Sequence, residues 1–325
     1  MAELLLVSLG STAGLREADD EFAASLERSG VTVTVVRARP PRPMRTLMLT
    51  DYVWARAARA AALAGIASAR PRAIVYSSIT AALLWPREGA IRFDSLAAEN
   101  RPGRHGLWQR PLERRRLAQA RLLIPWSGAS LGALSPPAER IVVVGVPVES
   151  SGPALPFAAR DITAITYAAD PRKKGLDRVL AAWALARRPG EELVVAGGGA
   201  LATADGVRHV GLLPRAEYRE LLRRSSLFLA APRREDHGIA QLEALADGCM
   251  LVSTPAPGPY EALRLARILD PRLVTGDLVP AIRAALDTPL ADYADRAASA
   301  MGGFRRERID RVVADGLVSR LNVPA

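Results

Sequence analysis

The chain has 325 residues, a length that predicts two domains, and an apolar fraction of 49% with 5% aromatic residues indicates a globular protein packed on aliphatic side chains. A single cysteine excludes an intramolecular disulfide framework and a cysteine-based zinc site, and it favours a reducing compartment. The formal charge of +10 points to anionic partners, and we expect a cytoplasmic protein.

The chain begins with an apolar run, "MAELLLVSLGS", that is shorter than a membrane span and carries an acid, Glu3, where a signal peptide has positive charge. We expect a first buried strand here. The alanine-rich run 55–70 is interrupted by arginines and predicts a helix on the protein instead of a membrane anchor.

Short Val- and Ile-rich runs then alternate with amphipathic stretches along the chain. Alternation of this kind predicts an α/β fold in which parallel sheets are covered by helices on both faces. The expected helices include 16–30 and 176–190, and the expected strands are 4–10, 31–37, 73–78, 122–127, 139–145, 164–169, 192–198 and 227–232.

A Gly-, Pro- and Ser-rich stretch at 146–160 interrupts this pattern and marks the expected domain boundary. We predict an N-terminal domain over 1–150 and a C-terminal domain over 151–303, with ligands binding in the cleft outside the carboxyl ends of the strands. The final stretch, 304–325, follows two glycines and is expected to form a helix that packs back on the first domain.

The segment Arg101–Arg121 concentrates the positive charge, with seven arginines and one acid, Glu113. Such a segment suits an anionic membrane surface, a phosphorylated acceptor or nucleic acid, but it is equally consistent with a solvated helix face. Nucleic acid is the weaker alternative, because no recognisable binding module or aromatic platform accompanies the charge.

Residues 172–174 place three cations between a predicted strand and a predicted helix, in "DPRKKGLD". Cations beside a helix N-terminus suit a diphosphate, although a plain surface turn has the same composition. Glycines 197–199 close the next strand, where they permit positive φ or close approach of a ligand.

The stretch "EDHGIAQLEALADG" places Glu235 before a short apolar helix and Glu243 inside it. Helical side chains lean toward the helix N-terminus, so both carboxylates are expected to face one small volume. Carboxylates accept hydrogen bonds from sugar hydroxyls, and the N–H groups of Gly238 and Ile239 suit a phosphate. The alternative is that these acids favour the helix dipole only.

In this order, the basic "KG" loop, the glycine turn, "VRHVGLLP", the Glu-x7-Glu stretch and "LVSTPAPGPYEAL" resemble the donor half of the family 4 retaining glycosyltransferases over about 161–265. The resemblance implies a GT-B fold of two Rossmann-like domains with parallel sheets facing across a cleft. It implies an N-terminal acceptor domain and a C-terminal nucleotide-sugar donor domain.

The resemblance also assigns roles to matching residues. Glu243 would hold ribose hydroxyls, Glu235 would hold donor-sugar hydroxyls and Lys174 would neutralise the diphosphate, while the weaker final motif positions fall on Gly258 and Glu261. The catalytic residues expected are Glu235, Lys174 and His105, and the donor-binding residues expected are Gly14, Arg172, Lys173, Gly198, Asp236, His237, Gly238, Ile239 and Glu243.

The chain departs from the family at several points. Ala13 stands where a first glycine is usual, and Ala169 stands where an arginine is usual, so Arg172 or Lys173 would supply the second cation. Where many members have a histidine ending a strand of the first domain, this chain has Asp94, with His105 further on.

The resemblance implies a retaining hexosyltransferase that moves a sugar from a nucleotide-diphosphate sugar to an acceptor, with a UDP-sugar favoured and GDP-mannose next. The family reaction is a front-face displacement in which the departing phosphate oxygen takes the acceptor proton. No metal or cofactor is expected, since Lys174, a second cation and the helix N-terminus would stabilise the leaving diphosphate. The alternatives are a nucleotide-sugar epimerase of the same fold and a non-catalytic protein that binds a nucleotide-sugar or another anionic ligand.

Overall fold

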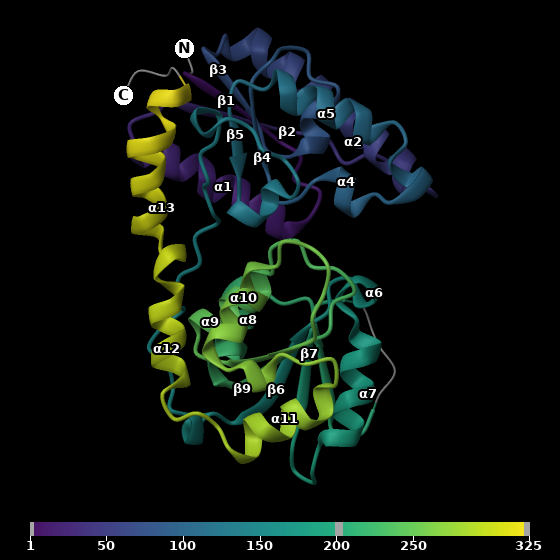
Figure 1. Cartoon of the computed structure of the whole chain (residues 1–325), viewed down its shortest axis with the longest axis vertical. Coiled ribbons are helices and arrows are strands. Elements are labelled where there is room, and N and C mark those ends of the chain that lie inside the picture. The colour runs from purple at the N-terminus through teal and green to yellow at the C-terminus, as the bar shows by residue number, and fades with distance from the viewer. Residues whose placement is uncertain (1–2, 199–203, 322–325) are drawn as a thin grey trace. The chain divides into compact units, whose positions relative to one another are not determined.

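A computed structural model describes residues 3–198 and 204–321, so Gly199 of the predicted glycine turn lies outside the described residues. The chain forms two compact units (Figure 1). The first comprises Met1–Pro147 and Arg306–Ala325, and the second comprises Val148–Arg305. The chain therefore leaves the first unit once and returns to it at its end.

The first unit is built on a parallel sheet of five strands in the order β2-β1-β3-β4-β5. Its elements are β1 (Leu4–Ser8), α1 (Ala13–Arg28), β2 (Val33–Arg37), α2 (Leu47–Ala69), β3 (Ala73–Tyr76), α3 (Ile79–Leu83), β4 (Ala90–Phe93), α4 (Ala97–Asn100), the single turn η1 (Gly103–Gly106), α5 (Gln109–Gln119), β5 (Leu123–Pro125) and α13 (Arg306–Val312).

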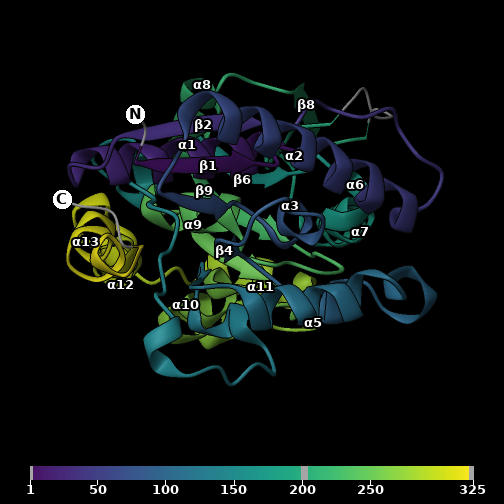
Figure 2. The ribbon, with the colours of Figure 1, turned by 90° about the horizontal axis from the view of Figure 1, so that it is seen from above.

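Both faces of this sheet are buried, and β1 shows why. Alternate side chains of a strand point to opposite faces, so Leu5 and Val7 enter one core, under α2, α3 and α5. Leu4 and Leu6 enter the other, which is closed by α1 and by side chains of the C-terminal segment such as Ile309 and Val313. The helices of each face can be followed in Figure 2.

The C-terminal helix is fixed to the first unit by a polar contact as well as by this core. Asp310 on α13 accepts hydrogen bonds from Ser25 at 2.5 Å and from the Arg28 guanidinium at 2.7 Å, both on α1. Burial raises the pKa of Asp310, but Arg28 and Ser25 outweigh that effect and hold it below its usual value.

The second unit repeats the architecture with a parallel sheet in the order β10-β9-β6-β7-β8. Its elements are β6 (Ile162–Tyr167), α6 (Pro171–Lys174), α7 (Leu176–Ala186), β7 (Leu193–Ala196), β8 (Val207–Gly211), α8 (Arg215–Arg224), β9 (Ser225–Ala230), α9 (Ile239–Ala246), β10 (Met250–Ser253), α10 (Glu261–Leu269), α11 (Leu278–Asp287) and α12 (Tyr293–Ala300). The predicted α/β class with two parallel sheets is confirmed.

One predicted strand, 139–145, is wrong. The segment makes an isolated bridge at Ile141 and runs beside β5, where Val142 and Val144 donate to the carbonyls of Leu123 and Pro125. Pro125 has no N–H to return a bond, so the ladder stops there.

Three strands were not predicted: β4, β8 and β10. β4 contains a fully buried arginine, Arg92, whose guanidinium lies between the rings of Phe22 and Trp126 and contacts Asp19. A charged residue in a four-residue strand obscures the apolar pattern on which strand prediction depends. β8 is interrupted in the same way by Arg208 and His209.

Among the described residues, no helix combines the length and the apolar character that crossing a membrane requires.

Candidate functional site

The cationic loop, which carries residues 172–174, lies at the carboxyl end of β6 in the second unit. Asp170 caps α6 by accepting a hydrogen bond from the Lys173 N–H at 2.9 Å. Gly175 ends the turn with φ of 66°, and a Cβ there would lie 1.9 Å from the carbonyl oxygen of Ala231, just after β9. The glycine therefore lets the loop pack against the end of β9 and fixes where Lys174 starts.

The glycine turn after β7 lies beside the same loop. Gly198 has φ of 75°, and a Cβ there would lie 2.8 Å from the carbonyl oxygen of Ala168, which links β6 to the cationic loop. Gly197 is equally close to the backbone of Ala169. The structure thus brings the predicted cationic loop and the predicted glycine turn together.

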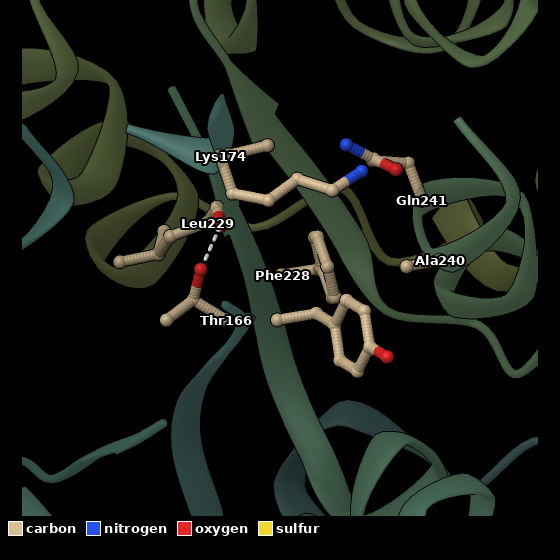
Figure 3. A pocket seen from close by; sticks show the side chains of 8 residues that line it. Thr166, Lys174, Phe228, Leu229, Ala240 and Gln241 are labelled. Atoms are coloured by element: carbon tan, nitrogen blue, oxygen red, sulfur yellow. Dashed lines mark hydrogen bonds between the residues drawn. The ribbon is translucent and has the colours of Figure 1, made fainter. Parts of the chain in front are cut away.

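Lys174 and Glu235 form the central contact of this region. The Lys174 ammonium donates to Oε2 of Glu235 at 2.6 Å, and the Gln241 amide on α9 donates to the same oxygen at 3.3 Å. Glu235 is only 5% exposed, so its charge depends on these donors. Figure 3 shows Lys174 and Gln241 converging over a pocket that is also lined by Thr166, Tyr167, Phe228, Leu229, Ala230 and Ala240.

The segment that carries Glu235 is braced by the loop before α10. The Glu235 N–H donates to the carbonyl of Pro257, and a Cβ on Gly258 would lie 2.1 Å from the Glu235 carbonyl oxygen. Tyr260 has positive φ of 32° and its hydroxyl lies 2.9 Å from that of Ser253. Close backbone packing at Gly258 therefore holds the Glu235 carboxylate in position.

The neighbouring acid, Asp236, accepts hydrogen bonds from Lys173 at 3.2 Å and from Arg234 at 2.9 Å. Burial raises the pKa of Asp236, but the two cations outweigh burial and lower it below the usual value. Lys173 and Lys174 thus each hold one acid of the Glu235–Asp236 pair.

Gly238 precedes α9 with φ of 84°, and a Cβ there would lie 2.9 Å from the Tyr260 ring. Ile239 is the first residue of α9. The side chain of His237 is buried, with its ring in edge contact with Phe304 at 6.4 Å between centroids.

Glu243 lies inside α9 and is 6% exposed. It accepts from Arg215 at 2.8 Å, and Arg219 lies 3.7 Å away. Arg219 in turn makes two hydrogen bonds to the fully buried Asp247, at 2.7 and 2.9 Å, and one to the carbonyl of Glu149. Glu243 therefore belongs to a chain of alternating charges that runs into the core.

The other predicted residues are distributed as follows. Arg172 is exposed on α6. Gly14 lies in the first turn of α1, where Thr12 caps the helix by accepting from the Leu15 N–H at 3.2 Å, and His105 is exposed in η1. Both belong to the first unit, whereas the residues described above belong to the second.

Two residues of this region were missed by sequence reasoning. Gln241 contacts Glu235 from six positions away. It lies in the first turn of α9, and the expected helix start between the two residues was a signal for this contact. Arg215 is 28 positions from Glu243, and no local pattern links them.

Within residues 3–198 and 204–321, no three His, Cys, Asp or Glu side chains are grouped as a metal site requires.

Residues 160–292 match the protein family described as "Glycosyl transferases group 1". No curated protein matches the chain. Among solved structures, sucrose-phosphate synthase from Thermosynechococcus elongatus is similar with a TM-score of 0.71 at 14% identity, over 96% of this chain and 97% of that chain. HepE from Anabaena in complex with UDP and glucose has a TM-score of 0.69 at 16% identity, over 98% and 100%.

The fold is GT-B. WaaG, a glycosyltransferase involved in lipopolysaccharide biosynthesis, is a further GT-B neighbour, with a TM-score of 0.56 at 16% identity over 92% of this chain and 99% of that chain. The segment that matches the family, 160–292, falls within the second unit and contains Lys174, Glu235 and Glu243.

Proposed function

We propose that the protein is a retaining glycosyltransferase that transfers a hexose from a nucleotide-diphosphate sugar, with a UDP-sugar as the favoured donor and GDP-mannose next. The observation that carries the proposal is the Lys174–Glu235 contact between the cationic loop and the segment before α9. This contact brings an ammonium and a carboxylate side by side, and in the proposal the ammonium binds the diphosphate while the carboxylate binds a sugar hydroxyl. A GT-B neighbour crystallised with UDP-glucose supports the choice of base.

In this proposal the second unit binds the donor and the first unit binds the acceptor, with Gly14 among the donor-binding residues and His105 among the catalytic ones. Glu235 accepts a hydrogen bond from a hydroxyl of the donor sugar through Oε1, because Lys174 and Gln241 both donate to Oε2. Glu243 accepts ribose hydroxyls, and Gly198, Asp236, His237, Gly238 and Ile239 surround the donor.

The proposed chemistry is a front-face displacement. The bond from the anomeric carbon to the leaving phosphate oxygen breaks while the acceptor oxygen bonds on the same face, and the departing phosphate oxygen takes the acceptor proton. Lys174, with Arg172 or Lys173, stabilises the charge that develops on the diphosphate, so transfer is expected to proceed without a metal and to survive chelator.

Calorimetric titration with UDP, GDP and ADP tests the donor site. We expect UDP to bind, and Lys174→Ala to weaken binding about tenfold or more, as loss of a charged hydrogen bond does. Arg267→Ala removes an exposed cation from α10 and is the matched control. If no nucleoside diphosphate binds, or if the control loses as much affinity, the proposal is wrong.

A second measurement separates transfer from epimerisation. The protein is incubated with UDP-glucose and a mixture of sugar and lipid-linked sugar acceptors, and the products are resolved by mass spectrometry. Transfer gives UDP and a product heavier by one hexose. Release of UDP with a rearranged free sugar in the absence of acceptor would favour the epimerase instead.

A further inference from the structure

Large apolar side chains are exposed at the start of α2 and just after η1 in the first unit. Leu47 is 51% exposed, Leu49 45% and Tyr52 43%, all in the first two turns of α2, and Met44 just before the helix is 40% exposed. Leu107, which follows η1, is 63% exposed. Burial of apolar surface is the main driving force for folding, so a gathering of exposed apolar side chains indicates a contact surface.

Specific contacts hold these two segments together. The Tyr52 and Trp108 rings meet edge to face with centroids 5.9 Å apart, and the Trp108 indole N–H donates to the Met48 carbonyl at 3.4 Å. Asp51, buried in α2, accepts from Arg101 at 2.6 Å and from Gln109 at 2.8 Å. The start of α2 and the η1 segment therefore form one continuous surface.

The two segments that form this surface expose only positive charge. Within residues 38–60 and 101–121, all of which the structure describes, the two carboxylates are buried: Asp51 is paired as above, and Glu113 accepts the N–H groups of Ala97 and Ala98 at 2.6 and 3.1 Å. The exposed arginines around the apolar side chains are Arg42, Arg45, Arg56 and Arg104.

The arginines that the sequence singled out, Arg101–Arg121, do not all belong to this surface. Arg101 is engaged by Asp51, and Arg116 stacks on Trp85 at 5.1 Å while donating to the Leu83 carbonyl at 2.9 Å. Burial against the protein lowers the pKa of Arg116. The arginine-rich segment of the sequence therefore coincides with this surface only in part.

We infer that the α2–η1 patch, defined as Met44, Leu47, Leu49, Tyr52 and Leu107 with Arg42, Arg45, Arg56 and Arg104, docks on a bilayer that contains anionic lipid. The arginines would contact lipid headgroups while the apolar side chains enter the boundary between headgroups and acyl chains. A soluble polyanion accounts for the arginines but not for the leucines. A second copy of the chain would bring arginine against arginine across an isologous interface.

This inference goes beyond the proposed sugar transfer and does not depend on it, because lipid binding and UDP binding are measured separately. Co-sedimentation of the purified full chain with vesicles of phosphatidylcholine and phosphatidylglycerol is the test, with pure phosphatidylcholine vesicles alongside. We expect partition into the anionic vesicles that decreases as salt is added, because exposed charges are screened.

Two variants examine the two components of the patch. Arg42→Gln/Arg45→Gln/Arg104→Gln is expected to lower partition at least about tenfold, and Leu47→Ser/Leu107→Ser about tenfold, since both charge and apolar burial contribute. The matched controls change exposed residues elsewhere: Arg267→Gln/Arg308→Gln/Arg311→Gln for charge and Leu185→Ser/Ile268→Ser for apolar surface. UDP binding is expected to be unchanged in all four variants.

Equal partition of the patch variants and their controls would overturn the inference. If only the arginine variant loses binding, the surface recognises negative charge without inserting, and bilayer docking is wrong. If the chain sediments as a dimer without lipid and Leu47→Ser/Leu107→Ser makes it monomeric, the patch is an interface between copies.

Discussion

Glu235 and Glu243 lie eight positions apart, are almost equally buried, and differ in what holds them. Glu235 is held by Lys174, whose side chain is 20% exposed, and by a neutral amide. Glu243 is held by Arg215 and by Arg219, and Arg219 is 8% exposed and tied to Asp247. The first acid is thus held by one lysine and one amide, whereas the second is linked through Arg219 to a buried aspartate.

The difference teaches that two carboxylates of nearly equal burial can be tied to the core to different degrees. Lysine carries its charge on a flexible stem, so the Lys174 ammonium can contact a phosphate while it stays beside Glu235. The Arg219–Asp247 pair has no such freedom, since either group left alone would be a buried charge. Substitutions of the residues that hold Glu243 are therefore expected to change stability, and substitutions of the two acids themselves are expected to change ligand binding.

The largest expected effect follows breaking the core end of the Glu243 network. Asp247→Ala leaves the Arg219 guanidinium without its main partner. Burial lowers the pKa of Arg219, and it is Asp247, with smaller contributions from Glu243 and Tyr218, that raises the pKa above its usual value. We expect the free energy of unfolding to decrease by about 3–5 kcal/mol, measured by urea denaturation.

Asp161→Ala serves as the control for this change, because it breaks an ion pair with Arg224 in which both side chains are exposed. It is expected to cost less than about 1 kcal/mol. A similar loss of stability in both variants would mean that the buried network contributes no more than a surface pair.

The next effect concerns binding and distinguishes the two acids by ligand. If Glu243 contacts ribose and Glu235 contacts the sugar, Glu243→Gln weakens UDP and UDP-glucose alike, by about tenfold, the usual value of one hydrogen bond to a charged group. Glu235→Gln weakens UDP-glucose by a similar factor and leaves UDP unchanged. Titration calorimetry with both ligands measures this split, and a loss of UDP binding in Glu235→Gln would contradict it.

Much of the fold was predictable from the sequence, because buried parallel strands give apolar runs such as 4–10 and amphipathic helices give a 3.6-residue period. Short strands carrying charge were not: β4 holds Arg92, which is compensated by Asp19 and two rings from distant elements. At the candidate site, Lys174 and Glu235 followed from motif order. The Arg215–Glu243 contact did not, since it depends on how α8 packs beside α9.

A smaller effect is expected at the exposed end of the Glu243 network. The Arg215 side chain is 48% exposed, and in Arg215→Ala the carboxylate of Glu243 retains Arg219 as a neighbour. The free energy of unfolding should therefore fall by less than about 1 kcal/mol. If urea denaturation instead gave a loss as large as that of Asp247→Ala, Arg215 and Arg219 would act as one unit.

The smallest effect is a dependence of stability on acid pH, and it comes from Asp236, the neighbour of Glu235. Lys173 and Arg234 hold the pKa of Asp236 below 3.8 despite burial. The folded state therefore binds its proton less readily than the unfolded state, so the stabilisation is complete above pH 3.8 and is lost as pH falls through the lower, folded value. Because Lys173 is 44% exposed, we expect this contribution to the free energy of unfolding to be less than about 1 kcal/mol.

Urea denaturation from neutral to acid pH should show a shallower decline of the free energy of unfolding in Asp236→Asn than in the parent. Parallel curves for Asp236→Asn and the parent would mean that the two cations do not stabilise the Asp236 carboxylate.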